Sequence, residues 1–339
     1  MRVAVVGATG AVGREMLRIL EERDFPVDEL LPLASVRSEG NKVPFRGGQV
    51  PVRELTHEGL ASAELALFSA GAEVSKEFVP KAAASGVICI DNSSAFRMDP
   101  DVPLSIPEIN PEALQGSPKI VSVPNCTAIT ALMPVGPLHH AAGLRSLVLS
   151  SYQSVSGAGW KAVRELVEQV DKMHGMEDEL GHPDAASMPV GDVMGKTIAY
   201  NVVAKIGDFE EGGYTGEEAK MMAEPAKILG IPDLQAAATS VRVPVAVGHA
   251  VSIMASFSRA ITPQQARDAL SSAPGVELRD DPGRGIYPSP LEAAGLDDVL
   301  VGRVRQGPDE NTLLLFSCCD NLRKGAALNA VQIAEHLLG

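Results

Sequence analysis

A glycine-rich string near the N-terminus restricts the fold of this chain more than any other feature. Residues 7–13 read GATGAVG, directly after the apolar run RVAVV and before a segment with apolar residues at helical spacing. Glycines after a strand permit a tight turn and a close approach of backbone to a phosphate, and the next helix N-terminus offers free N–H groups. The order strand, glycine turn, helix predicts a dinucleotide-binding Rossmann-type fold more strongly than an incidental turn. The expected contact residues are Gly7, Thr9, Gly10, Ala11 and Val12.

The end of the second expected strand indicates which dinucleotide binds. NAD enzymes usually place an acidic residue there to bind the ribose 2′-hydroxyl. This chain has Arg37, with Ser35 and Ser38 beside it. A guanidinium and hydroxyls suit a 2′-phosphate. The segment therefore predicts NADP, and the alternative is a solvated loop with an incidental arginine.

The N-terminal part alternates strand-like and helix-like segments. Apolar runs predict strands at residues 30–34, 63–69, 87–90 and 119–123. A helix is expected over residues 75–84, with Ser75 as its cap, and Gly71 before it is a further expected cofactor contact. This β-α-β alternation predicts a mostly parallel, doubly wound sheet.

The pattern changes after about residue 129. Strands are expected at residues 144–155, 239–247, 250–258 and 312–318, helices at 161–174 and 216–229, and a long connection at 175–213. These segments predict a mixed, largely antiparallel sheet with helices on one face. A last amphipathic helix, residues 323–338, is expected to pack back on the first domain. The chain is thus expected to be an α/β protein. A Rossmann-type domain would comprise residues 1–127 plus 321–339, and an α+β catalytic and dimerisation domain residues 128–320.

Composition excludes other classes of protein. The 339 residues carry a formal net charge of −14, whereas a nucleic-acid partner would require a basic surface. No apolar run reaches the ~18 residues of a membrane span, and the N-terminus lacks a signal-peptide pattern. The four cysteines lack metal-site spacing. We therefore expect a cytoplasmic protein with reduced thiols, no metal and no membrane partner.

Cys126 is the strongest candidate for a nucleophile. It lies in VSVPNCTAIT, where a strand ends, Pro124 turns the chain and a helix begins. A helix N-terminus favours the thiolate, so we expect a lowered pKa there. The other cysteines, Cys89, Cys318 and Cys319, lie in apolar runs and are expected to be core residues.

A thiolate nucleophile needs an acid or base nearby. Most of the seven histidines fall on expected helices or in irregular segments. His249 instead stands at a Gly-His junction between two apolar strands. Spacing alone leaves open whether it is a catalytic or a core histidine.

Several motifs, taken together, match one family. They are GATGAVG, SVRS, SSAFR (93–97), PNCTA (124–128), YQSVSGAG (152–159), EEAK (217–220), VRVPV-x-x-GH (241–249) and DNLRKGAA (320–327). In order and at fitting spacing over essentially the whole chain, they resemble the aspartate-β-semialdehyde dehydrogenases. The resemblance implies NADPH-dependent reduction of β-aspartyl phosphate to aspartate β-semialdehyde and phosphate, a step toward lysine, threonine, methionine and isoleucine. It also implies a homodimer or homotetramer.

The resemblance also implies roles for individual residues. Cys126 would form the acyl-enzyme, His249 would be the acid/base and Gln153 would orient the substrate. The implied substrate contacts are Arg97, Lys220 and Asn125 for phosphate, Arg242 for the carboxylate and Glu217 for the amino group. The implied contacts to the nicotinamide half of the cofactor are Ser156, Gly157 and Asn321.

Two other functions remain open at this point. One is N-acetyl-γ-glutamyl-phosphate reductase, which shares the fold plan and the cysteine chemistry, although glycine typically precedes its nucleophile and Asn125 does so here. The other is an inactive paralogue that acts as a binding protein. Such proteins usually lose the nucleophile, whereas this chain keeps Cys126 together with Gln153, Arg242 and His249.

Overall fold

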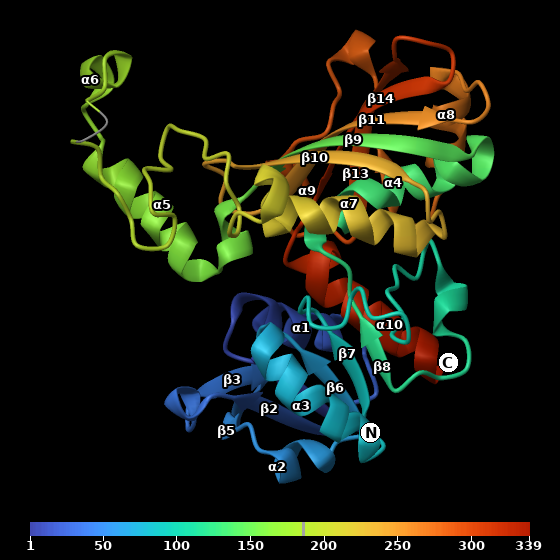
Figure 1. The fold of residues 1–339 in the computed structure, drawn as a ribbon. Coiled ribbons are helices and arrows are strands. Elements are labelled where there is room, and N and C mark those ends of the chain that lie inside the picture. The colour runs from blue at the N-terminus through green and yellow to red at the C-terminus, as the bar shows by residue number, and fades with distance from the viewer. Residues whose placement is uncertain (185–186) are drawn as a thin grey trace.

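Two six-stranded sheets organise the chain, one in each half of the molecule (Figure 1). The computed structural model describes residues 1–184 and 187–339. Its parallel first sheet and mixed second sheet confirm the expected fold class. Residues 185 and 186, inside the expected connection 175–213, lie outside the described residues.

The first sheet is wholly parallel and has helices on both faces. Its strand order is β5-β2-β1-β6-β7-β8. In chain order these strands are β1 (Arg2–Val6), β2 (Glu29–Ala34), β5 (Arg53–Glu54), β6 (Leu65–Phe68), β7 (Ile88–Asp91) and β8 (Ile120–Ser122). The helices are α1 (Ala11–Glu22), α2 (His57–Ala61), α3 (Ala72–Ala84) and the C-terminal α10 (Leu328–Leu338). A small hairpin, β3 (Lys42–Phe45) with β4 (Gly48–Pro51), stands beside them.

Strand β1 shows why these parallel strands read as continuous apolar runs. Val3 and Val5 join the core that also contains α1 and α10, whereas Ala4 and Val6 join a separate core with α2 and α3. A strand covered on both faces has no polar side, so apolar residues do not alternate with polar ones.

The second sheet is mixed, in the order β10-β9-β11-β14-β13-β12. Its strands are β9 (Leu144–Gln153), β10 (Gln235–Arg242), β11 (His249–Phe257), β12 (Val276–Leu278), β13 (Val299–Gln306) and β14 (Thr312–Cys319). Three helices cover one face: α4 (Cys126–Ala142), α7 (Gly216–Leu229) and α8 (Pro263–Ser271). Short α9 (Pro290–Ala293) packs on β14. Helices α5 (Trp160–Lys172) and α6 (Glu177–Gly181) extend away from the sheet in Figure 1.

Two crossings connect the sheets. Helix α4 begins where β8 ends and packs against β9 and β11 of the second sheet. After β14 the chain forms one turn of π-helix, Arg323–Ala327, and continues as α10 against β6 and β7. The expected return of the last helix to the first sheet is therefore confirmed.

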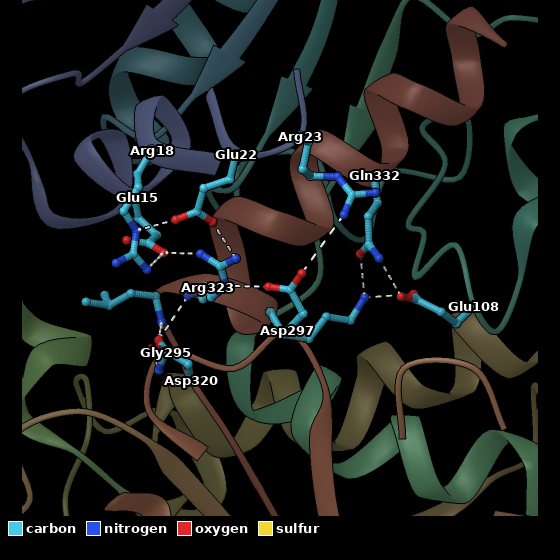
Figure 2. A network of polar contacts seen from close by, with 12 residues as sticks. Glu15, Arg18, Glu22, Arg23, Glu108, Gly295, Asp297, Asp320, Arg323 and Gln332 are labelled. Carbon is cyan, nitrogen blue, oxygen red and sulfur yellow. Dashed lines mark hydrogen bonds and ion pairs between the residues drawn. The ribbon is translucent and has the colours of Figure 1, made fainter. Parts of the chain in front are cut away.

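Arg323 joins the two sheets at the second crossing (Figure 2). Its Nη1 lies 3.1 Å from Glu15 and its Nη2 2.6 Å from Glu22, both on α1, and its Nε pairs with Asp297 between α9 and β13. The side chain of Arg323 is 8% exposed. One guanidinium thus ties the helix after the glycine turn to a loop of the second sheet.

Some sequence expectations were wrong in detail. Ser75 does not cap α3, because that helix begins at Ala72 after Gly71, and the Ser75 hydroxyl donates to buried Asp91 instead. The expected strand 144–155 ends at Gln153, where a 3₁₀ turn follows. Strands β12 and β13 were not expected. Within residues 1–184 and 187–339, no helix is long and apolar enough to cross a membrane.

Candidate active site

In the glycine turn after β1, the neighbouring backbone leaves no room for a side chain at Gly7 or Gly13. Gly7 has φ +86°, and a Cβ there would come 2.5 Å from the carbonyl oxygen of Ser69. A Cβ on Gly13 would come 2.2 Å from the carbonyl oxygen of Gly7. Helix α1 begins at Ala11 behind Gly10, and no side chain caps its first N–H groups. This helix start therefore fits the pyrophosphate of a dinucleotide.

A cavity of about 570 Å³ opens beside this turn at the end of β2. The expected residues that line it are Gly7, Thr9, Gly10, Ser35, Arg37 and Ser38. Arg37 lies exposed in a 3₁₀ turn, Val36–Ser38, and the Thr9 hydroxyl lies 3.5 Å from that of Ser38. The structure therefore brings the expected guanidinium and hydroxyls together in one cavity beside the glycine turn.

A second cavity, of about 340 Å³, joins the glycine turn to Cys126. Its lining includes many expected site residues: Gly10, Ala11, Val12, Gly71, Arg97, Asn125, Cys126, Ser156, Gly157 and Asn321. They come from both halves of the molecule. The side chains of Ser156 and Asn321 hydrogen-bond to each other at 3.0 Å. The cavity thus places the expected nucleophile beside the expected site of the cofactor.

Cys126 is the first residue of α4, as expected, but its pKa is not lowered. The Asn125 side chain caps the helix by accepting from Thr127 N at 2.9 Å and Ala128 N at 3.3 Å. Burial, helped by the charge of Glu217, raises the pKa of the Cys126 thiol to about 11, although nearby Arg97 opposes the shift. The expectation of a lowered pKa was therefore wrong, because desolvation outweighs the favourable charges.

Glu217 contacts three of the residues that are expected to bind the substrate. Its Oε1 accepts from Asn125 Nδ2 at 2.9 Å and from Gln153 Nε2 at 3.1 Å, and its Oε2 lies 3.4 Å from Lys220 Nζ. Glu217 is 8% exposed. The pair Glu217–Lys220 is therefore no ordinary surface ion pair, since its carboxylate is fixed by the side chain that caps α4 and by one from β9.

His249 is fully buried at the start of β11. Burial, together with the charge of Arg242, holds the pKa of His249 well below its usual range, so the ring is neutral at pH 7. The Ser154 backbone N–H donates to Nδ1 at 3.1 Å, which places the proton of the neutral ring on Nε2. Among the described residues Nε2 has no partner. Arg242 is 7% exposed and donates to the Ser154 carbonyl at 2.7 Å.

Comparisons with known proteins agree with this geometry. A model of the semialdehyde dehydrogenase NAD binding domain matches residues 2–117, and one of the semialdehyde dehydrogenase dimerisation domain matches residues 135–324. The aspartate-semialdehyde dehydrogenases of Aquifex aeolicus and Bacillus subtilis are 46% and 45% identical, over 99% of this chain and 98% and 97% of theirs. The chain belongs to the aspartate-semialdehyde dehydrogenase family.

Solved structures of the family share the fold. The aspartate semialdehyde dehydrogenase II of Vibrio cholerae, solved as a complex with ASA, has a TM-score of 0.92 and 41% identity, over 99% of this chain and 98% of that one. An enzyme from Candida albicans solved with NADP has a TM-score of 0.76 at 22% identity, over 99% and 98% of the chains, which shows likeness of fold alone. As a member of the aspartate-semialdehyde dehydrogenase family, the chain is an oxidoreductase with an NAD(P)-binding Rossmann domain and a dimerisation domain.

Two residues that the sequence did not indicate contact the expected site residue Arg97 or its segment. Glu224 and Lys227 lie on α7 beyond Lys220, and both contact Arg97 or its segment. Glu217, Lys220, Glu224 and Lys227 are spaced by three, four and three residues, which is one face of a helix. That spacing was the available signal, but a charged helix face usually indicates solvent.

Proposed function

We propose that this chain reduces β-aspartyl phosphate to aspartate β-semialdehyde and phosphate, reversibly, through a thioester on Cys126. The Cys126 sulfur attacks the acyl carbon, and the bond from that carbon to the phosphate oxygen breaks. The thiol proton leaves with the phosphate, so a thioester and free hydrogen phosphate remain. NADPH supplies the hydride that reduces the thioester. The carbon–sulfur bond of the resulting thiohemiacetal then breaks as its hydroxyl returns a proton to His249, and the Cys126 thiolate and the aldehyde are released.

The residues around Cys126 suit the parts of this substrate. Arg97 and Lys220 would hold the phosphate, with Asn125 beside them, and Arg242 would hold the α-carboxylate through its planar fork. Glu217 would accept from the α-ammonium, and Gln153 would orient the acyl group. N-acetylglutamyl phosphate has no free ammonium, so the buried Glu217 carboxylate disfavours it as the substrate.

His249 is proposed as the proton donor and acceptor. Its ring is neutral at pH 7 and carries its proton on Nε2. From there it would donate to the oxygen on which charge develops when the thioester is reduced. The Cys126 backbone N–H, at the start of α4, would stabilise the same oxygen.

We propose NADP rather than NAD as the cofactor. The support is Arg37 with Ser35 and Ser38 in the cavity at the end of β2, together with the uncapped start of α1. Thr9, Gly10, Ala11, Val12 and Gly71 would contact the phosphates, and Ser156, Gly157 and Asn321 the nicotinamide half.

The single observation that carries this function is the cavity shared by the glycine turn and Cys126. The direct test is phosphate-dependent reduction of NADP with aspartate semialdehyde, with acetyl-glutamate semialdehyde as the competing substrate. Activity with the first alone supports the proposal. Preference for the second would favour the alternative reductase, and no activity with either would favour an inactive paralogue.

We also propose a homodimer, or a tetramer of such dimers, formed through the open face of the second sheet. Strand β9 turns Leu147 and Leu149 to the covered face and leaves Val148 and Tyr152 47% and 41% exposed on the other, where Tyr152 packs near Phe316. Light scattering gives the oligomeric state. Val148→Glu is expected to yield monomers.

The proposed domain division and location follow from the same features. Helix α10 packs on β6 and β7, which supports assigning residues 321–339 together with 1–127 to the cofactor domain, and residues 128–320 to the catalytic domain. All four cysteines are free, and a reactive thiol suits the reducing cytoplasm. Expression with a fluorescent tag would test the location.

A further inference from the structure

Arg97 lies in an irregular segment whose own backbone does not fix the position of the arginine side chain. The segment between β7 and β8 that carries it has neither helix nor strand around position 97. An arginine side chain in such a segment loses much conformational entropy when it is fixed in one position. Yet Arg97 is 8% exposed and lines the cavity beside Cys126. Contacts from elsewhere must therefore orient it.

Glu224 on α7 supplies one of these contacts. Its Oε1 accepts from Arg97 Nη1 at 3.0 Å, and its Oε2 accepts from the backbone N–H of Asn125 at 2.6 Å. Glu224 is 1% exposed. One buried carboxylate thus fixes the guanidinium and the residue before the nucleophile at the same time.

Lys227, one helical turn further along α7, supplies the second contact. Its Nζ donates to the backbone carbonyls of Arg97, Asp99 and Val102 at 2.8, 2.6 and 2.8 Å. An ammonium has three N–H donors, so these carbonyls use all of them. Lys227 therefore has no donor left for a ligand and serves the backbone that carries Arg97.

The remaining donors of Arg97 suit an anion in the cavity. Nη1 donates to Glu224, and Nη2 donates to the Asn92 carbonyl at 2.7 Å. Its Nε is buried and has no partner among the described residues. Neither Glu224 nor Lys227 belongs to the lining of the cavity. We infer that Glu224 and Lys227 are positioning residues that present Arg97 to the phosphate, an inference that rests on the proposed function.

Kinetic constants for the reverse reaction distinguish positioning from general stabilisation. Glu224 accepts from Arg97 Nη1 and from the Asn125 backbone N–H. In Glu224→Gln the amide N–H₂ would face one of these two donors, so one charge-assisted hydrogen bond is lost. The Michaelis constant for phosphate should rise about ten- to a hundredfold. Lys227→Met should change it in the same direction, and Lys227→Arg should restore most of the loss. The constants for aspartate semialdehyde and NADP should stay within about twofold.

Exposed residues of α3 provide matched controls. Lys76→Met and Glu73→Gln make the same chemical changes at side chains that are 57% and 89% exposed, and should leave all three constants unchanged. Calorimetric titration with inorganic phosphate measures the same effect without turnover. If wild type binds phosphate but shows no phosphate-dependent NADP reduction, the proposed function fails and this inference does not.

The inference is overturned if Glu224→Gln and Lys227→Met bind NADP normally and bind phosphate like wild type. It is also overturned if all three Michaelis constants and the melting temperature change together, because that is the signature of a structural role. If Glu224→Gln does not fold, Lys227→Met and Lys227→Arg provide the test. Normal phosphate binding by Lys227→Met, or a loss that Lys227→Arg does not restore, would overturn the inference.

Discussion

Gly325 lies so close to the nucleophile that a Cβ at position 325 would come 2.9 Å from the Cβ of Cys126. Gly325 is the middle residue of the π-helical turn between β14 and α10. A π-turn has a wider backbone path than an α-turn and often occurs at functional sites. Here it brings the backbone of the returning chain against the first residue of α4.

We therefore predict that Gly325→Ala impairs catalysis. Glycine to alanine normally stabilises a helix by about 1 kcal/mol, but here the new methyl group must displace Cys126 or the turn. The expected result is a fall in kcat of more than about tenfold. The free energy of unfolding should fall by about 1–3 kcal/mol, the usual cost of overpacking. Gly181→Ala, in α6 with open space around it, is the control and should leave kcat unchanged without lowering the stability. Wild-type turnover by Gly325→Ala would contradict the close contact.

The pKa of Cys126 predicts how its alkylation depends on pH. Because burial raises this pKa to about 11, the free enzyme holds mainly the thiol at neutral pH. Below its pKa the thiolate fraction rises about tenfold per pH unit, so the iodoacetamide rate should climb steadily from pH 7 to 10. Glu217→Gln should accelerate alkylation at a given pH, since Glu217 raises the pKa. A rate that levels off near pH 7 would show a low-pKa thiol.

Arg37 predicts the choice of cofactor. Arg37→Ala should weaken NADP binding by about 1.5–3 kcal/mol, or ten- to a hundredfold, through loss of a charge-assisted contact. NAD lacks the 2′-phosphate, so its affinity should be unchanged and serves as the internal control. Fluorescence titration of both reduced cofactors measures the two dissociation constants. Equal losses would show that Arg37 does not contact the 2′-phosphate.

Buried Arg323 and exposed Arg18 pair with the same two carboxylates, and we predict that they contribute differently to the free energy of unfolding. Arg323→Met leaves Glu15, Glu22 and Asp297 without their shared partner. Removal of one partner from a buried ion pair typically lowers the free energy of unfolding by ~3–5 kcal/mol. Because Asp297 is half-exposed, we expect a smaller loss of about 2–4 kcal/mol. Arg18 pairs with the same Glu15 and Glu22 but is 51% exposed, so Arg18→Met should cost less than about 1 kcal/mol. Urea unfolding measures both free energies. Similar values for the two variants would contradict the role of burial.

Local signals explain which elements the sequence predicts well. Helix α7 runs over the expected residues 216–229, because Thr215 and Glu218 form a capping box at its start and Gly230 adopts a left-handed conformation at its end. Both signals are short range and can be recognised in the amino-acid sequence. The glycine turn after β1 is predicted for the same reason.

Elements shaped by packing are harder to predict. Helix α4 is buried almost all round, so its apolar residues show no helical periodicity. Strand β13 is interrupted at Gly302, where a Cβ would come 2.1 Å from the Arg279 carbonyl oxygen, and Arg303 has φ +56°. The pKa of Cys126 and the contact of Glu224 with Arg97, 127 residues away, also depend on tertiary structure.

A single-turnover experiment tests the central claim, that Cys126 carries the acyl group. Enzyme mixed with aspartate semialdehyde and NADP in the absence of phosphate should reduce about one NADP per active site and then stop, because no phosphate is present to release the acyl group. Mass spectrometry of the digested enzyme should find one aspartyl thioester on Cys126, and phosphate should remove it. An acyl group on another residue, or an undiminished burst in Cys126→Ala, would contradict the account.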